Sequence, residues 1–246
     1  MVSIDRVYQK VLAFANKEQR GYITPQEFNL FADQAQMEIF EQYFYDINQW
    51  IRQHGNSTGH SDMLTNLEEK VNIFVKYDQF VVISGNYGNA MTSAFTDIYR
   101  LEMIRVNYQT NTRSTVAEEI QLIDQNKYGK SPLGRHSKKR PVYTRYKGSS
   151  NSNAIKIYPY PSSDASIDKV YLTYIQTPAT PNWGYVVVND KALYNSTAST
   201  DFMLHASEES ELVYRILAYA GISMKKPNLT QAAAGLEQAK VQQEKQ

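Results

Sequence analysis

The sequence predicts an α+β protein in which helices from both ends of the chain form a bundle around an inserted, antiparallel β-rich region. Helical spacing of apolar residues dominates the N-terminal part and returns near Ser207. Between them lie short segments typical of strands, separated by turn residues. The expected boundaries are 1–74 and 201–246 for the helical domain and 75–200 for the β-rich insertion, which includes one short helix.

The N-terminal part predicts three helices. Apolar residues at three- and four-residue spacing indicate the first, over 3–16, with a break at Gly21. The second begins at Thr24 with a capping box, because Glu27 stands three residues later, and runs to about Arg52. A shorter third helix is expected to begin at residue 61 or 62 and to reach residue 74.

The second helix is apolar over more than one stripe of its surface, so it needs more than one neighbour. Its own domain supplies some of these neighbours, and we expect other subunits to supply the rest. The candidate subunit interface consists of Leu30, Met37, Phe40 and Tyr43.

The middle of the chain predicts an antiparallel meander, since turns rich in Gly, Ser, Asn and Asp separate its strands. A second capping box, Thr115 to Glu118, predicts the one short helix, through about Asn126, with Glu118 and Glu119 as first-turn charges. Strands are expected at 80–83, 98–108, 141–146, 154–159, 169–175 and 185–188.

Two helices are expected at the C-terminus. Ser207 is expected to cap the first, which places Glu208 and Glu209 in the turn where the helix dipole favours negative charge and ends at Gly221. The segment 228–246 is polar, so it predicts a weak helix that needs a neighbour.

Composition excludes several classes of function. The 26 basic and 25 acidic side chains give a net charge of +1, so no global attraction to nucleic acid or anionic membranes is expected. The absence of cysteine excludes thiolate nucleophiles and cysteine metal sites. No apolar run is long enough to span a membrane, and residues 1–10 lack the apolar core of a signal peptide. We therefore expect a protein made in a cytoplasm without membrane association.

No catalytic, cofactor-binding or metal-binding residue is assigned. His54, His60 and Asp62 could bind zinc, but their spacing matches no recognised ligand pattern, so a solvated loop is the preferred interpretation. Phosphate-binding loops, dinucleotide fingerprints and nucleophile elbows do not occur. We predict that the protein is not an enzyme; a small hydrolase using His136 or His205 is an alternative without positive support.

One basic cluster stands out in the middle of the chain, with Tyr143 and Tyr146 among its cations. Basic side chains release counterions from a phosphate backbone, and aromatic rings stack or pack beside them. The simplest interpretation is a solvated loop before a strand; contact with DNA or with an acidic protein is the alternative. The candidate contact residues are Arg135, Lys138, Lys139, Arg140, Arg145 and Lys147.

Several segments carry a resemblance to known proteins. Residues 8–12 and 16–29 resemble structural proteins of tailed bacteriophages, particularly crAss-like and related podoviruses. The middle of the chain resembles the portal-proximal adaptor, or tail tubular protein A, class. The segments that carry this second resemblance are 99–102, 118–119, 141–143, 155–161 and 170–174, together with the returning helix 208–221.

This resemblance implies a virion structural protein, one subunit of a homo-oligomeric ring, often a dodecamer, that joins the portal to the tail and extends the DNA channel. The implied partners are further copies of the chain, the portal protein, other tail or ring proteins, and double-stranded DNA passing without sequence specificity. The implied location is the portal vertex of the virion, and no cofactor is implied. The alternative is a β-rich receptor- or glycan-binding tail component, for which the 19 tyrosines would provide stacking surfaces.

Overall fold

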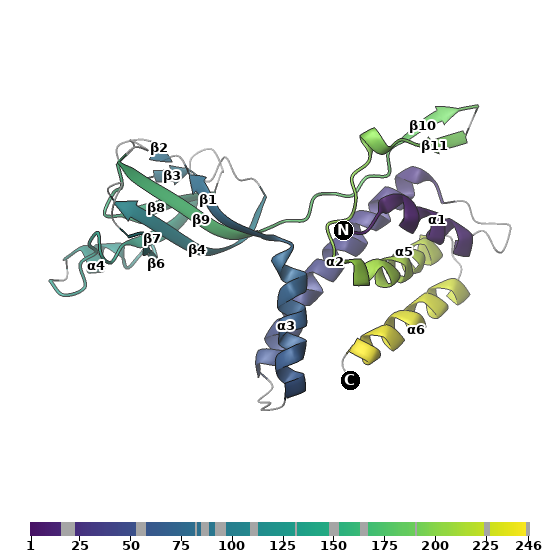
Figure 1. Ribbon diagram of the computed structural model, residues 1–246, viewed down its shortest axis with the longest axis horizontal. Coiled ribbons are helices and arrows are strands. Elements are labelled where there is room, and N and C mark those ends of the chain that lie inside the picture. Colours follow the sequence, from purple (N-terminus) through teal and green to yellow (C-terminus); the bar gives the residue numbers. More distant parts are fainter. Residues whose placement is uncertain are drawn as a thin grey trace. The chain divides into compact units, whose positions relative to one another are not determined.

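The computed structural model confirms the α+β class, with helices towards both ends of the chain and a β-rich region between them in the sequence (Figure 1). The chain forms two compact units. The helical unit comprises residues 1–74 and 178–246, and the β unit comprises residues 75–177. The structure describes residues 1–15, 23–52, 58–81, 83–84, 89–91, 97–108, 113–130, 132–147, 153–162, 167–189, 191–223 and 227–244.

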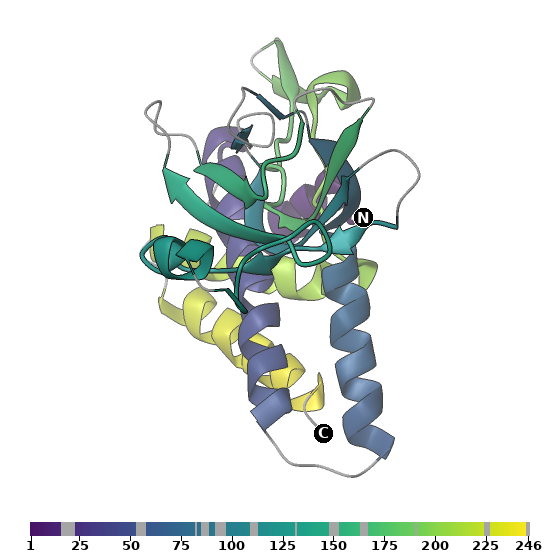
Figure 2. The same cartoon turned by 90° about the vertical axis from the view of Figure 1, so that its left-hand side faces the viewer.

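Five α-helices build the described part of the helical unit, and α5 contacts three of the others, α1, α2 and α6. The helix α2 pairs with α3, and Figure 2 shows the two side by side. The expected break at Gly21 and the loop residue His54 lie outside the described residues. The helices are α1 (Ile4–Ala15), α2 (Pro25–Arg52), α3 (Thr58–Asn72), α5 (Glu209–Ser223) and α6 (Pro227–Glu244).

Aromatic contacts fill much of the interior of this unit. The ring of Phe28, from α2, packs edge-on against Tyr8 of α1, with centroids 4.8 Å apart. Farther along α2, Phe40 packs in the same way against Phe74, also at 4.8 Å. Edge-to-face pairs of this kind stabilise a core beyond the area they bury. The expected core positions Phe28, Ala35 and Ile39 of the second helix are therefore buried, whereas Ile51, also expected on this face, is exposed.

The predicted start of α2 is confirmed. The backbone N–H of Thr24 donates to Oε2 of Glu27 at 3.0 Å, and the backbone N–H of Glu27 donates to Oγ1 of Thr24 at 3.3 Å. This reciprocal pair is the capping box, which satisfies two backbone donors that the helix leaves unpaired.

Residues 178–200 belong to the helical unit, whereas we expected the insertion to continue to residue 200. Buried Trp183 anchors them: its ring lies 4.2 Å from that of Tyr8, and its Nε1–H donates to Asp5 at 3.0 Å. Its backbone N–H also donates to Asn29 at 2.8 Å. The segment includes the hairpin of β10 (Tyr185–Val188) and β11 (Lys191–Tyr194), and the 3₁₀ turn η3 (Ser196–Ala198).

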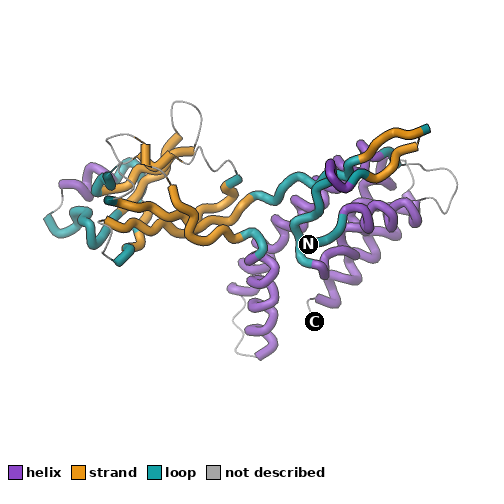
Figure 3. The backbone as a smooth tube through the Cα atoms, turned by 45° about the horizontal axis from the view of Figure 1, so that its top comes forward, coloured by secondary structure: helices purple, strands orange, loops and turns teal. Residues whose placement is uncertain are grey.

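Two sheets form the described part of the β unit, and apart from α4 (Gln125–Lys130) this part consists of strands and loops (Figure 3). The four-stranded sheet has the order β1-β9-β4-β5, and the five-stranded sheet has the order β2-β3-β8-β7-β6. Neighbouring strands are antiparallel except for β6 and β7. The strands are β1 (Val75–Val81), β2 (Ile83–Ser84), β3 (Asn89–Met91), β4 (Ile98–Tyr108), β5 (Thr115–Val116), β6 (Glu118–Glu119), β7 (Val142–Lys147), β8 (Asn153–Tyr158) and β9 (Asp168–Gln176).

Side chains from both sheets share one core, which includes Ile104 of β4, Leu172 of β9 and Ile157 of β8. The strand order differs from the predicted meander, because β9 lies between β1 and β4. The alternation of strand and turn segments in the sequence identified most of the longer strands, but not which strands lie next to each other in the sheets. Seven of the nine residues of β9 are buried, as expected for a central strand.

The predicted helix at Thr115–Asn126 was wrong. The backbone N–H of Ala117 donates to the carbonyl of Ile104 at 2.9 Å, and that of Ile120 donates to the carbonyl of Tyr143 at 2.9 Å. These contacts with β4 and β7 leave β5 and β6 extended. The capping pattern is local, whereas pairing with two existing strands also buries Ala117 and Ile120.

The start of the C-terminal helix also differs from the prediction. His205, not Ser207, is the N-cap: its ring accepts from the backbone N–H of Ser207 and begins the 3₁₀ turn η4 (Ala206–Glu208), which leads into α5. The polar segment after it does form a helix, α6, which packs on α5.

An ionic network joins the helices of this unit around Glu208, which is only 1% exposed. Its carboxylate contacts Nζ of Lys70 at 2.7 Å and Nζ of Lys240 at 3.1 Å, which bring in α3 and α6. Farther along α5, Arg215 contacts Glu211 at 2.7 Å and Glu38 of α2 at 3.1 Å. Buried charges need such partners, so the network constrains how four helices pack.

Removing the cap of α2 should destabilise the protein modestly. We expect Thr24→Ala to lower the free energy of unfolding by about 1 kcal/mol, because the first turn loses its side-chain acceptor. Urea unfolding followed by far-UV circular dichroism measures the change. Thr24→Ser, which keeps the hydroxyl, is the control; equal losses in both variants would contradict the capping role.

Stability should fall in acid through Glu208. Burial by itself would raise the pKa of Glu208, but Lys70 and Lys240 outweigh it and lower that pKa from 4.5 to about 2. A carboxylate with a lowered pKa stabilises the fold above its ordinary pKa, and this stabilisation is lost as the pH falls from about 4.5 towards 2. The loss should be on the order of 2 to 3 kcal/mol.

Urea midpoints measured between neutral pH and about pH 3 test this. Glu208→Gln should unfold more easily at neutral pH and show a flatter pH dependence than the wild type. Glu69→Gln, which changes an exposed carboxylate on α3, is the control. An unchanged pH dependence in Glu208→Gln would show that another group is responsible.

Candidate functional site

The basic cluster lies in the β unit, on the chain between α4 and β7. Its centre is a tight turn, in which the backbone N–H groups of Ser137 and Arg140 each donate to the other residue's carbonyl, at 3.1 and 2.9 Å. The turn places Lys138 and Lys139 at its tip, where both are exposed.

Two cations of the cluster are balanced by acidic side chains. Arg140 contacts Glu118 at 3.5 Å, and Arg145 contacts Glu119 at 2.8 Å, because β6 pairs with β7 in parallel. The hydroxyl of Tyr143 also donates to Glu119, at 3.1 Å. These contacts give Arg140 and Arg145 a structural role, which the sequence did not indicate.

The other predicted contact residues are placed differently. Arg135 and Lys139 are exposed and form no ion pair within the described residues. Nζ of Lys138 lies 5.9 Å above the ring of Tyr108. Lys147 ends β7, and its side chain lies outside the described part of the chain.

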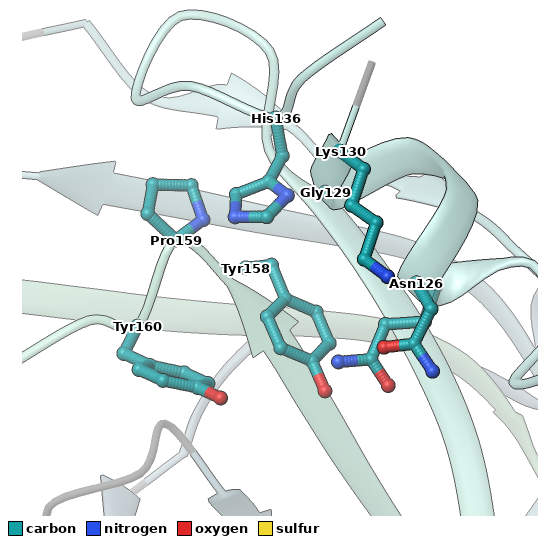
Figure 4. A pocket seen from close by; sticks show the side chains of 8 residues that line it. Asn126, Gly129, Lys130, His136, Tyr158, Pro159 and Tyr160 are labelled. Carbon is teal, nitrogen blue, oxygen red and sulfur yellow. The ribbon is translucent and has the colours of Figure 1, made fainter.

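A cavity of about 380 Å³ lies beside this turn and connects the cluster with α4 and the end of β8 (Figure 4). His136, from the basic cluster, forms part of its wall. The residues that line it are Gln125, Asn126, Gly129, Lys130, His136, Tyr158, Pro159 and Tyr160.

Aromatic rings gather on one part of this cavity. The ring of Tyr158 lies 5.5 Å from that of His136 and 5.2 Å from that of Tyr160, measured between centroids. Strand alternation places Lys156 on the same face as Tyr158. Nζ of Lys156 lies 5.5 Å from the centroids of both tyrosine rings, close enough for a cation–π contact.

The electrostatics of the cavity follow from its partial burial. Burial, and then the charge of Arg135, lower the pKa of His136, so its ring is predominantly neutral at pH 7. Burial also raises the pKa of Tyr158, although the positive charge of Lys156 beside its ring opposes this shift. The cavity therefore offers a neutral aromatic surface with nearby ammonium groups.

The described residues give no structural support to the zinc site or the hydrolase site considered from the sequence. The described residues contain no group of three His, Asp or Glu side chains able to hold a metal ion. Of the suggested zinc ligands, His54 and the side chain of His60 lie outside the described part. His205 caps η4 in the helical unit, and His136 lines the cavity of the β unit.

The candidate interface on α2 needs correction. Phe40 and Tyr43 are buried in the helical unit, where Phe40 packs on Phe74 and Lys70 lies above the ring of Tyr43. Leu30 is 71% exposed, and Met37 is partly exposed.

A different set of α2 residues is partly or fully exposed, although Phe44 also packs edge-on against Phe40, with ring centroids 5.1 Å apart. Phe44 and Ile51 continue from Leu30 and Met37 at seven-residue intervals, and Ile51 is also exposed. We call these four residues the α2 stripe. The heptad spacing was visible in the sequence and would have selected Phe44 and Ile51 in place of Phe40 and Tyr43.

The β10–β11 hairpin is a second exposed apolar surface of the helical unit. Its strands pair only with each other in the described structure, from Tyr185 opposite Tyr194 to Val188 opposite Lys191. Its exposed apolar side chains are Val186, Val187, Val188, Leu193 and Tyr194.

The protonation of His136 provides a direct test of the cavity's environment. We expect its NMR titration midpoint to lie below 6.5, since burial and Arg135 both disfavour the charged ring. Arg135→Ala should raise the midpoint towards 6.5, because only burial then acts. Lys139→Ala is the matched control; a midpoint above 6.5 in the wild type would contradict the described cavity.

No protein-family model matches the chain, and no curated protein is significantly similar to it. No helix in the described part combines the length and apolar character needed to cross a membrane.

Proposed function

We propose that the chain is a virion structural protein, a subunit of an oligomeric ring that joins the portal to the tail and extends the DNA channel. The observation that carries the proposal is the exposed β10–β11 hairpin. Val187 is 61% exposed on one face of β10, and Val186 and Val188 are exposed on the other. A partner is needed to remove this apolar surface from water.

The hairpin has the features of an assembly element. A two-stranded ribbon is marginally stable in water, and its open edges offer unpaired backbone groups to another strand. Contiguous exposed apolar surface commonly marks a protein–protein contact. Pairing with a strand of a neighbouring subunit would give the backbone groups hydrogen-bond partners and would also cover the apolar side chains.

The α2 stripe provides the second surface that a ring requires. In a ring, each subunit meets its two neighbours through different surfaces, because the contacts are head-to-tail. The stripe runs from Leu30 to Ile51, which are 21 positions apart, or roughly 31 Å along the helix. Repetition around the ring multiplies modest contacts of this kind.

The resemblance of the sequence to the phage adaptor class supports the finer parts of the proposal. These are the portal protein and other tail or ring proteins as partners, double-stranded DNA in the lumen, and a location at the portal vertex. The glycan-binding alternative requires only a monomer or trimer, so assembly state separates the two.

Mass photometry and cryo-electron microscopy, with and without the portal protein of the same virion, test the proposal. We expect rings beside the portal and smaller species without it. Val187→Lys should weaken each subunit contact by about tenfold or more, because a charge replaces a valine that the proposed contact would remove from water. Val116→Lys, an exposed valine of the β unit, is the matched control. A chain that stays monomeric with the portal would overturn the proposal.

A further inference from the structure

The cavity beside α4 has the size and lining of a ligand site. Its volume of about 380 Å³ falls within the range of small-molecule sites and can hold one nucleoside. We propose that it binds one unpaired nucleotide of a single-stranded nucleic acid, with the base in the cavity and adjacent phosphates on the basic turn. This site belongs to the β unit and does not depend on ring assembly.

The aromatic surface suits a nucleobase. Tyr160 is 45% exposed, and its ring stands beside that of Tyr158 at the mouth of the cavity (Figure 4). Any base can stack on an exposed tyrosine, because every base has a π-face. His136, neutral at pH 7, adds a third ring without placing a charge against the base.

Polar groups in the cavity can read the edge of the base. The hydroxyl of Tyr158 is buried, and a phenol O–H can both donate and accept a hydrogen bond. In Figure 4 it points to the same side of the cavity as the amide of Asn126. Gln125 also lines the cavity, and amides supply both donors and acceptors, as base edges require.

Positive charge surrounds the cavity and continues beyond it. Figure 4 shows the side chain of Lys130 extending into the cavity, and Lys156 lies beside both tyrosines. Lys138 lies over Tyr108, whose hydroxyl donates to the carbonyl of Pro159, a lining residue, at 2.6 Å. No carboxylate from the described part of the chain lines the cavity.

The extent of this charge favours a polyanion. Glu118 and Glu119 are each paired with an arginine, so they do not neutralise the turn that carries Arg135, Lys138 and Lys139. An acidic sugar has one carboxylate to offer the cavity, whereas a nucleic-acid strand places a phosphate on each side of the bound base. A base in a duplex is stacked and paired, so it cannot enter without first being flipped out.

Fluorescence anisotropy with a labelled oligothymidylate of about 12 nucleotides tests the site on the full chain. We expect binding that weakens with salt, and at least tenfold weaker binding of the matching duplex. Tyr160→Ala should weaken binding roughly 5- to 100-fold, the range for loss of one stacked base. Tyr99→Ala, which truncates a similarly exposed tyrosine elsewhere in the β unit, is the matched control.

The contribution of the lysines to binding is measured separately, from the salt dependence of the affinity. Replacing Lys130 and Lys138 together by alanine should reduce the slope of log affinity against log salt by roughly 0.7 for each phosphate that is no longer neutralised. Lys76→Ala, which removes an exposed lysine of β1, should leave the slope unchanged.

Three results would overturn the proposal: no binding of the oligonucleotide, equal binding of the duplex, or equal affinity of the Tyr160→Ala and Tyr99→Ala variants. Binding of oligogalacturonate in place of the oligonucleotide would also overturn it and identify an acidic-glycan site. Val187→Lys should bind the oligonucleotide normally, so failure of ring assembly and failure of this site are distinguishable.

Discussion

The helical unit depends on the neutralisation of one buried carboxylate. Glu208 stands where η4 passes into α5, and its charge is tolerated only because ammonium groups from α3 and α6 reach it. The same helix then carries Arg215, which extends the network to α2 through Glu38. The network therefore specifies how α2, α3, α5 and α6 pack as well as stabilising them, since its charges are all paired only when the four helices are in place. The polar helix α6 acquires through Lys240 an anchor that its own apolar residues could not provide.

In the β unit, ion pairs lie at the surface and involve the basic cluster. The parallel strands β6 and β7 bring two glutamates against Arg140 and Arg145, so part of the basic cluster is held in ion pairs at the surface of the sheet. The cations left on the turn and around the cavity have no such acidic partners among the described residues, and they adjoin the tyrosines at the end of β8. The single basic cluster of the sequence is thus two groups, one structural and one available to a ligand.

The two units therefore carry different kinds of surface. The helical unit exposes apolar side chains on the α2 stripe and the β10–β11 hairpin, which suit contacts between subunits. The β unit contains a cavity with aromatic walls and a basic border, which suits a small or extended anionic ligand. We propose that assembly and ligand binding use these separate parts of one chain.

The sequence alone determined the α+β class and those elements whose signals are local, such as the start of α2, where Thr24 and Glu27 bond to each other. The same capping pattern failed at Thr115, because β4 and β7 offered its backbone better partners. Periodicity likewise showed that α2 is broadly apolar, but not that Phe40 would be covered by Phe74. Only the tertiary structure decided the burial of Trp183, the pairing of the basic cluster and the cavity itself. Each depends on contacts between residues far apart in the chain, whose proximity no local pattern encodes.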